Sequence, residues 1–163
     1  MRWLGKAVGE PIARSAGEMT LFIPHGVKGF VSREDGSVSL RNILVPAAQR
    51  PRPLPAVEAA ARLIRNLKLP AGVVTLLHVG PESDAPALRL PEGSTWKWTR
   101  TNATGDPVEK ILETASAVGA DLIIMTTAGR DGFLDGLRGS NSEQVLRKAQ
   151  CPVASLPVGS FLG

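Results

Sequence analysis

The stretch Ala120-Asp121-Leu122-Ile123-Ile124-Met125-Thr126-Thr127-Ala128-Gly129 decides the fold class of this chain. Its apolar centre has no polar face, which is typical of strands in a parallel sheet that helices cover on both sides. Other short apolar runs lie before and after it, and one run alternates large apolar residues with polar ones. We therefore predict parallel strands at 43–46, 73–79, 95–101, 121–126 and 153–157.

Helix signals lie between these runs. The alanine-rich segment 56–67 follows Pro55 and gathers its apolar residues on one face. Asp106-Pro107-Val108-Glu109 combines a capping aspartate, a proline that suits a first turn and a glutamate three residues after the cap. Ser140-Asn141-Ser142-Glu143 repeats the capping pattern, and Pro152 ends the helix that follows. This alternation predicts an α/β fold with a doubly wound, five-stranded parallel sheet.

The connection between the second and third predicted strands is short. A crossover that contains a helix needs about 10–12 residues at the least, and Pro81, Pro86 and Pro91 interrupt this one. We expect a proline-rich loop with at most a vestigial helix. Trp96 and Trp98 share one face of the strand that follows, and the missing helix leaves that face for a partner.

The N-terminal residues repeat a pattern from the end of the chain. Residues 12–26 parallel residues 145–159 at a constant offset of 133, with the arginine, alanine, proline and glycine positions identical. The echo predicts a helix and a strand, 19–23, that copy the last helix and strand. We expect strand 19–23 to pair with a last strand, its own or a partner's. The expected organisation is an extension over 1–41, a domain over 42–158 and a tail over 159–163.

Composition narrows the classes of protein. The chain has 163 residues, a net charge of +4 that is spread evenly, and no basic stripe, so we expect no nucleic-acid partner. No run is long and apolar enough for a membrane helix, and the charged first 20 residues do not fit a signal peptide. The single cysteine, Cys151, fits a reducing compartment. We expect a cytoplasmic protein without a metal site, in which Cys151 and His78 are structural.

Glycine and serine residues follow the deciding strand. Gly129 comes three residues after the predicted strand 121–126, and Gly139-Ser140 opens the last capped helix. Glycine lets backbone approach a ligand, and a helix N-terminus attracts phosphate. In a doubly wound sheet, ligands bind beyond the carboxyl ends of the strands, where strands 42–46 and 121–126 would end. Chemistry alone leaves open whether Gly139 and Ser140 bind phosphate or merely begin a helix.

A set of motifs resembles the universal stress protein family over residues 42–158. The motifs are Ile43-Leu44-Val45-Pro46, Leu76-Leu77-His78-Val79, Gly105-Asp106-Pro107, Ala120-Asp121-Leu122-Ile123-Ile124-Met125, Gly139-Ser140 and Cys151-Pro152-Val153. The resemblance implies an adenine nucleotide alpha hydrolase-like sheet of five parallel strands, ordered 3-2-1-4-5, that dimerises through its last strand. It also implies that ATP or AMP is the cofactor where the site is retained, and that members without the site act through partners.

The resemblance assigns a nucleotide site and shows where this chain departs from it. Thr126 replaces the first glycine of the family's phosphate loop and would narrow the pocket or twist the backbone, and Ala48 replaces the carboxylate that holds the nucleoside. Arg130 and Arg138 would either reach phosphate oxygens or remain solvated in the loop. The implied cofactor-binding residues are Pro46, Val79, Met125, Gly129, Arg130, Arg138, Gly139, Ser140 and Ser142, with no catalytic residue and no metal ligand.

These observations favour a regulatory or binding module in the stress response, with a degenerate nucleotide site. The alternative is an ATP- or AMP-binding protein that hydrolyses ATP slowly, and a third reading is a partner subunit for a complete family member. No nucleophile–base pair can be assembled from the sequence, so we expect no enzyme. We expect a homodimer through the last and N-terminal strands, or pairing with another universal stress protein.

Overall fold

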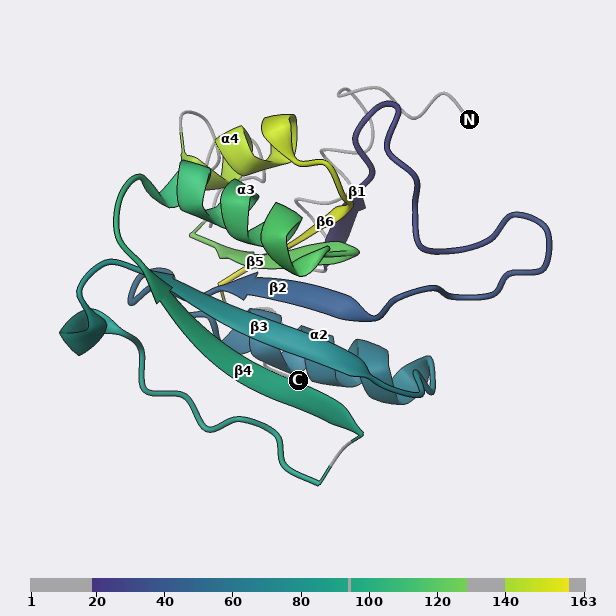
Figure 1. Ribbon diagram of the computed structural model, residues 1–163, viewed down its shortest axis with the longest axis horizontal. Coiled ribbons are helices and arrows are strands. Elements are labelled where there is room, and N and C mark those ends of the chain that lie inside the picture. The colour runs from purple at the N-terminus through teal and green to yellow at the C-terminus, as the bar shows by residue number, and fades with distance from the viewer. Residues whose placement is uncertain (1–18, 94, 129–139, 159–163) are drawn as a thin grey trace.

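The computed structural model describes residues 19–93, 95–128 and 140–158, and three layers are visible in it (Figure 1). A twisted sheet lies between one helix on one face and two helices on the other. The strands are β1 (Thr20–Phe22), β2 (Asn42–Pro46), β3 (Gly72–Val79), β4 (Trp96–Ala103), β5 (Leu122–Thr127) and β6 (Val153–Pro157), and the helices are α2 (Leu54–Asn66), α3 (Pro107–Val118), α4 (Asn141–Lys148) and the 3-10 turn η1 (Glu82–Asp84).

The sheet has six strands in the order β1-β6-β5-β2-β3-β4. Every pairing among β2 to β6 is parallel, whereas β1 pairs with β6 in the antiparallel sense. The predicted α/β class is therefore confirmed, and the sheet consists of five parallel strands and one antiparallel strand from the N-terminal residues. The sixth strand is β1, which pairs with the last strand of its own chain, as the N-terminal echo allowed.

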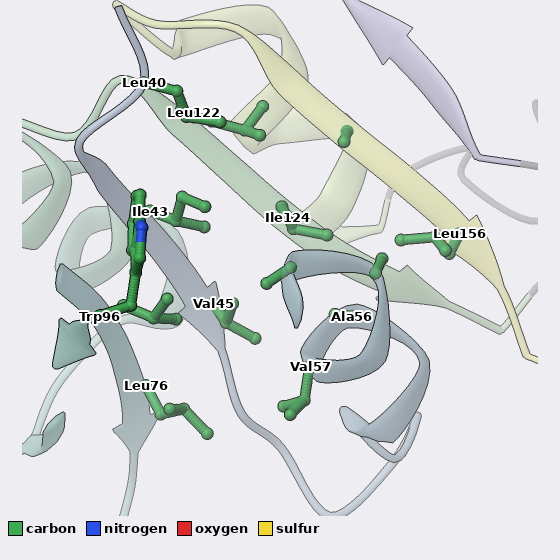
Figure 2. Packing of buried hydrophobic residues seen from close by; sticks show 14 of the residues in the cluster. Leu40, Ile43, Val45, Ala56, Val57, Leu76, Trp96, Leu122, Ile124 and Leu156 are labelled. Atoms are coloured by element: carbon green, nitrogen blue, oxygen red, sulfur yellow. The ribbon is translucent and has the colours of Figure 1, made fainter. Parts of the chain in front are cut away.

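Helix α2 covers one face of the sheet. Its buried residues are Ala56, Val57, Ala59 and Ala60, and their small side chains let the helix lie close to the strands. Figure 2 shows Ala56 and Val57 facing Val45, Ile124 and Leu156 across this layer. The predicted start of this helix, after Pro55, is two residues too late. Pro55 lies within the first turn, where its missing N–H has no role.

Helices α3 and α4 cover the opposite face. Val108 and Ile111 of α3 and Val145 of α4 pack on Leu44, Ile123, Met125 and Val153 of the strands. Both caps form as the sequence predicts, because Asp106 accepts the N–H of Glu109 at 2.9 Å and Ser140 accepts the N–H of Glu143 at 3.2 Å. Gly119 ends α3 in the left-handed conformation with φ of 62°, which explains the glycine at that place.

The crossover between β3 and β4 contains no α-helix, only η1 and an extended segment, as predicted. Leu88 and Leu90 of this segment pack on the core beneath α2 and stand in for the missing helix. The expectation that Trp96 and Trp98 face a partner is therefore wrong for Trp96, which is only 3% exposed. Its indole N–H donates to the carbonyl of Leu69 within the same chain.

Candidate functional site

The switch point, where the sequence predicts a ligand crevice, lies between the ends of β2 and β5. The two strands pair only at Ile43–Leu122 and Leu44–Ile123, near their starts. Beyond these pairs β2 leads to α2 on one face, and the chain after β5 leads to α4 on the other. Adjacent strands whose connections leave in opposite directions open the crevice in which doubly wound proteins bind ligands.

Three predicted residues from three strands line this end of the sheet. Pro46 and Val79 are the last residues of β2 and β3, and both are half-buried. Met125 of β5 is 6% exposed, and it belongs with Val79 to the core on the α3 and α4 face. These three apolar residues, which are far apart in the sequence, thus come from neighbouring strands, and a wall built from them would expose Pro46 and Val79 rather than the buried Met125. A flat apolar ring is the kind of ligand group that such a wall suits.

The N-terminus of α4 supplies the polar part. Ser140 occupies the N-cap and Ser142 lies in the first turn, where helix geometry leaves N–H groups without an intrahelical acceptor. Glu143 places a carboxylate in the same turn, and Arg147 binds it at 2.7 Å. The ion pair offsets the negative charge that would otherwise oppose an anion at this helix end.

The remaining predicted residues cannot be placed. Gly129, Arg130, Arg138 and Gly139 belong to the segment 129–139, which lies outside the described residues. Of the residues that the resemblance assigns to phosphate, the structure describes Ser140 and Ser142. The four residues of segment 129–139 stay predictions.

The two departures from the family pattern have different structural outcomes. Ala48 is exposed in the loop after β2, where it offers no hydrogen-bonding side chain. Thr126 is only 7% exposed, and its Oγ1 accepts the N–H of Ala56 at 3.3 Å in the first turn of α2. Because alternate strand residues point to opposite faces, Thr126 points away from the side of Met125. The expectation that the Thr126 side chain narrows the pocket is wrong, since it caps α2 instead.

The two side chains with reactive chemistry, His78 and Cys151, serve the fold. The ring nitrogens of His78 lie 2.9 Å from the carbonyl oxygen of Ala47 and 3.1 Å from that of Pro81, so the imidazole ties the end of β3 to two loops. Burial raises the pKa of the Cys151 thiol to about 11, and the carboxylate of Asp121 adds to the shift. The thiol therefore stays protonated at neutral pH and is no nucleophile.

One hollow was not anticipated from the sequence. A cavity of about 410 Å³ lies between the crossover after β3 and the ends of β3 and β4, on the α2 face. Leu76, Leu88, Arg100 and Asn102 are among its walls, and the guanidinium of Arg100 donates to the carbonyl of Leu88. The short proline-rich crossover was the signal for it, because a loop that replaces a helix fills less space.

Some classes of site are absent from the part of the chain that the structure describes. Within residues 19–93, 95–128 and 140–158, no three His, Cys, Asp or Glu side chains are grouped for a metal ion. No helix in these ranges has the length and hydropathy of a membrane span.

Two kinds of comparison with known proteins are informative. A family model matches the sequence from β4 onward, and solved structures are compared with the fold. The model of the universal stress protein family matches residues 97–157. A universal stress protein of Methanocaldococcus jannaschii is 45% identical over 49 residues, which are 30% of this chain and 29% of that protein.

Solved structures show the same fold. A universal stress protein from Archaeoglobus fulgidus has a TM-score of 0.56 at 20% identity over 71% of this chain and 44% of that one. A second structure of a universal stress protein from Archaeoglobus fulgidus has a TM-score of 0.50 at 16% identity over 71% of this chain and 93% of that one.

The matched part of this chain corresponds to less than half of the Methanocaldococcus protein and of the first Archaeoglobus protein. The sequence match over residues 97–157 includes the motif that ends at Met125 of β5, and it does not reach β2 or β3. Residues 97–157 are therefore similar in sequence to the universal stress protein family, and the fold of the described residues is similar to that of a solved family member.

Proposed function

We propose that this chain is a regulatory or binding module of the stress response, working in the cytoplasm, whose adenine-nucleotide site is degenerate. The observation that carries the proposal is the unequal state of the site's two halves. The phosphate half has a capped helix N-terminus at Ser140 and a neutralised Glu143, whereas the nucleoside half has Ala48 where family members that bind nucleotide have a carboxylate.

The missing carboxylate has a calculable consequence for affinity. A hydrogen bond to a charged group contributes about 1.5–3 kcal/mol, which corresponds to roughly 10- to 150-fold in a dissociation constant. The apolar wall of Pro46, Val79 and Met125 still offers a surface for a base. We therefore propose that ATP and AMP bind weakly, and that the module acts mainly through protein contacts.

Titration calorimetry with ATP and AMP tests the proposal. Weak or undetectable binding is expected for the natural chain, and dissociation constants in the low micromolar range or below would overturn it. Ala48→Asp is expected to tighten binding by about 10- to 150-fold. Gln49→Asp is the matched control, because it adds the same charge to the neighbouring exposed residue without restoring the position.

A second substitution, at Thr126, can be combined with Ala48→Asp, and its choice depends on the contact between Thr126 and α2. Thr126→Gly would remove the acceptor that caps α2 and so would mix a folding defect with any gain in binding. Thr126→Ser keeps the oxygen and removes only the methyl group. No gain from Ala48→Asp, alone or with Thr126→Ser, would place the cause of weak binding elsewhere in the site.

The alternative is an ATP- or AMP-binding protein with slow hydrolysis. The helix N-terminus at Ser140 favours it, since this anion-binding element is intact in the described residues. Incubation of the natural chain with ATP, followed by quantification of released phosphate, separates the two functions. Release above that of a Ser140→Ala/Ser142→Ala variant would favour the alternative.

A further inference from the structure

The cavity on the α2 face is separate from the candidate nucleotide site. Its volume of about 410 Å³ falls within the roughly 300–1,000 Å³ that is usual for small-molecule sites. Among the residues that the structure describes, none that the resemblance assigns to the nucleotide lines this cavity. Val79 and Met125 of the nucleotide site pack on the opposite face of the sheet, with α3 and α4. A molecule in the cavity would therefore be a second ligand of this chain.

Hydrogen bonds tie the walls of the cavity to one another. The imidazole of His78 joins the end of β3 to two loops, and the side-chain amide of Asn102 donates to the carbonyl of Gly80 at 2.9 Å. Beyond η1 the crossover continues as an extended segment toward the start of β4 (Figure 1). Arg100 holds this segment through the carbonyl of Leu88. The walls are thus fixed before a ligand enters, which lowers the cost of binding.

Much of the wall is apolar. The crossover contributes Ala85, Pro86, Ala87 and Leu88, and the sheet contributes Leu76 of β3. Leu76 is only 3% exposed, so its side chain is shielded from water on the sheet side of the cavity. An apolar ligand group of moderate size suits these walls, because it leaves water on binding.

Two opposite charges also line the cavity. Glu82 belongs to η1, and Arg100 belongs to β4. In the part of the chain that the structure describes, no ion pair joins either residue to another side chain. The guanidinium of Arg100 donates to the carbonyl of Leu88, and it carries five N–H groups in all. The cavity therefore offers one charged group to an anion and one to a cation.

The two charges lie toward different ends of the cavity. Arg100 and Asn102 are two residues apart on the same face of β4, which corresponds to roughly 7 Å along a strand. Asn102 is bonded to Gly80, and Glu82 follows Gly80 by two residues. Glu82 therefore belongs to the Asn102 end of the cavity and Arg100 to the other end. A short ligand that carries both an ammonium group and a carboxylate can contact both side chains.

We propose that this cavity binds a free α-amino acid with an apolar side chain. The ligand's carboxylate binds the guanidinium of Arg100, whose parallel N–H groups match the two oxygens of a carboxylate. Its ammonium group binds Glu82, and its side chain lies against Leu76 and Leu88. A simple carboxylic acid would meet Glu82 as a like charge, and a simple amine would meet Arg100. The two charges therefore select a zwitterion over either ion.

Titration calorimetry on the natural full chain tests the class of ligand. The probes are L-leucine, L-methionine and L-phenylalanine, and at least one should bind saturably with a dissociation constant below about 1 mM. Its analogues without the ammonium group or without the carboxylate should bind at least about 10-fold more weakly, because each loses a charged contact. For leucine these analogues are 4-methylpentanoate and 3-methylbutylamine. No saturable binding of the three amino acids, or equal binding of either analogue, overturns the proposal.

Two variants assign the charged ends. Arg100→Gln should weaken binding of the amino acid at least about 10-fold without weakening binding of the amine analogue. Glu82→Gln should weaken binding of the amino acid to a similar extent without weakening binding of the carboxylate analogue. Arg89→Gln and Glu92→Gln are the matched controls, since both residues are exposed in the same crossover and neither lines the cavity. Equal losses in the controls, or losses that do not depend on the analogue, overturn the assignment.

A measurement without substitutions locates the ligand. It is needed because Arg100 also holds the crossover, so its replacement can loosen the cavity. In nuclear magnetic resonance spectra of the natural chain, the amino acid should shift the backbone amide signals of residues 82–88 and 100–102. Shifts centred on residues 140–142 would place it at the start of α4 and overturn the cavity site. Saturating ATP should leave the affinity unchanged, so this result is independent of the proposed nucleotide site.

Discussion

The two ends of the parallel strands differ in how their polar groups are used. At the amino ends, side chains bind the chain's own backbone: Asp121 accepts the N–H groups of Arg41 and Asn42, both at 2.9 Å. At the carboxyl ends, β2 leads into the loop with Ala48 and the chain after β5 leads to the capped start of α4. Thr126 and His78 also bind backbone at the carboxyl ends, so both ends stabilise the fold. The comparison teaches that the candidate ligand chemistry lies at the carboxyl ends, so substitutions at the amino ends should change stability without changing ligand binding.

The largest expected effect lies at the amino end, at Gly72. A Cβ on Gly72 would lie 2.3 Å from the carbonyl oxygen of Arg41 and 2.5 Å from the Trp96 ring, and the carbonyl is backbone that cannot rotate away. We expect Gly72→Ala to lower the free energy of unfolding by about 3 kcal/mol, the upper range for overpacking. Urea unfolding followed by circular dichroism measures it.

Gly29→Ala is the matched control for Gly72. A Cβ on Gly29 would meet only the end of the Ile23 side chain, at 3.5 Å, which is ordinary contact. A similar loss for both variants would contradict the steric explanation. The remaining folded fraction of Gly72→Ala should bind phosphate as the natural chain does, because the two ends are separate.

The next effect is a loss of stability at alkaline pH. The pKa of the buried Cys151 thiol is raised to about 11 from an ordinary value of 9.0, so the folded state disfavours the thiolate. The stabilisation is complete below pH about 9 and declines as the pH rises toward 11, by at most about 3 kcal/mol. Urea unfolding between pH 8 and about 11 measures this window.

Two variants separate Cys151 from other groups that titrate at high pH. Cys151→Ala should remove this part of the alkaline decline. Asp121→Asn should lower the thiol pKa, because the carboxylate contributes to the shift, while it also weakens the contacts to Arg41 and Asn42. An unchanged decline in Cys151→Ala would show that other groups cause it.

Local patterns predicted the elements and missed the contacts that join them. The caps at Asp106 and Ser140 and the proline-rich crossover depend on neighbouring residues, so the sequence specifies them. The Asp121 contact to Arg41 spans 80 positions and the Thr126 contact to Ala56 spans 70, and no periodicity encodes such a meeting. The repeat of residues 145–159 in residues 12–26 predicted that β1 pairs with a last strand. It did not predict whether that strand belongs to the same chain or to a second copy, because the same register fits both pairings.

The candidate site divides in the same way. Pro46, Val79 and Met125 were implied by the family resemblance, and the structure places them toward the carboxyl ends of β2, β3 and β5, while their role as site residues stays a prediction. The direction of the Thr126 side chain could not, since it depends on where α2 begins in space. The threonine in place of glycine suggested a narrowed pocket. Its side chain instead accepts the N–H of Ala56 on the α2 face of the sheet.

A smaller effect tests this capping role. Thr126→Val keeps the shape of the side chain and removes the oxygen that accepts the N–H of Ala56. Helix α2 has no side-chain cap of its own at Pro53, so we expect a loss of about 1 kcal/mol, typical of a lost cap. Thr127→Val is the control: its hydroxyl donates to the carbonyl of Leu156, which can accept other donors. A larger loss for Thr127→Val would argue against the cap.

The smallest effect lies midway along β6, between the two ends, and has the opposite sign. The Ser155 hydroxyl is buried without a partner among the described residues, so the folded state loses its hydration without a compensating bond. Ser155→Ala removes that oxygen and leaves a small void, so we expect a gain in stability of up to about 1 kcal/mol. Ser83→Ala, at an exposed serine in η1, should be nearly neutral by comparison. Urea unfolding of both variants at pH 7 compares them, and a clear loss for Ser155→Ala would mean that the hydroxyl is bonded in solution, by water that reaches the β1–β6 edge.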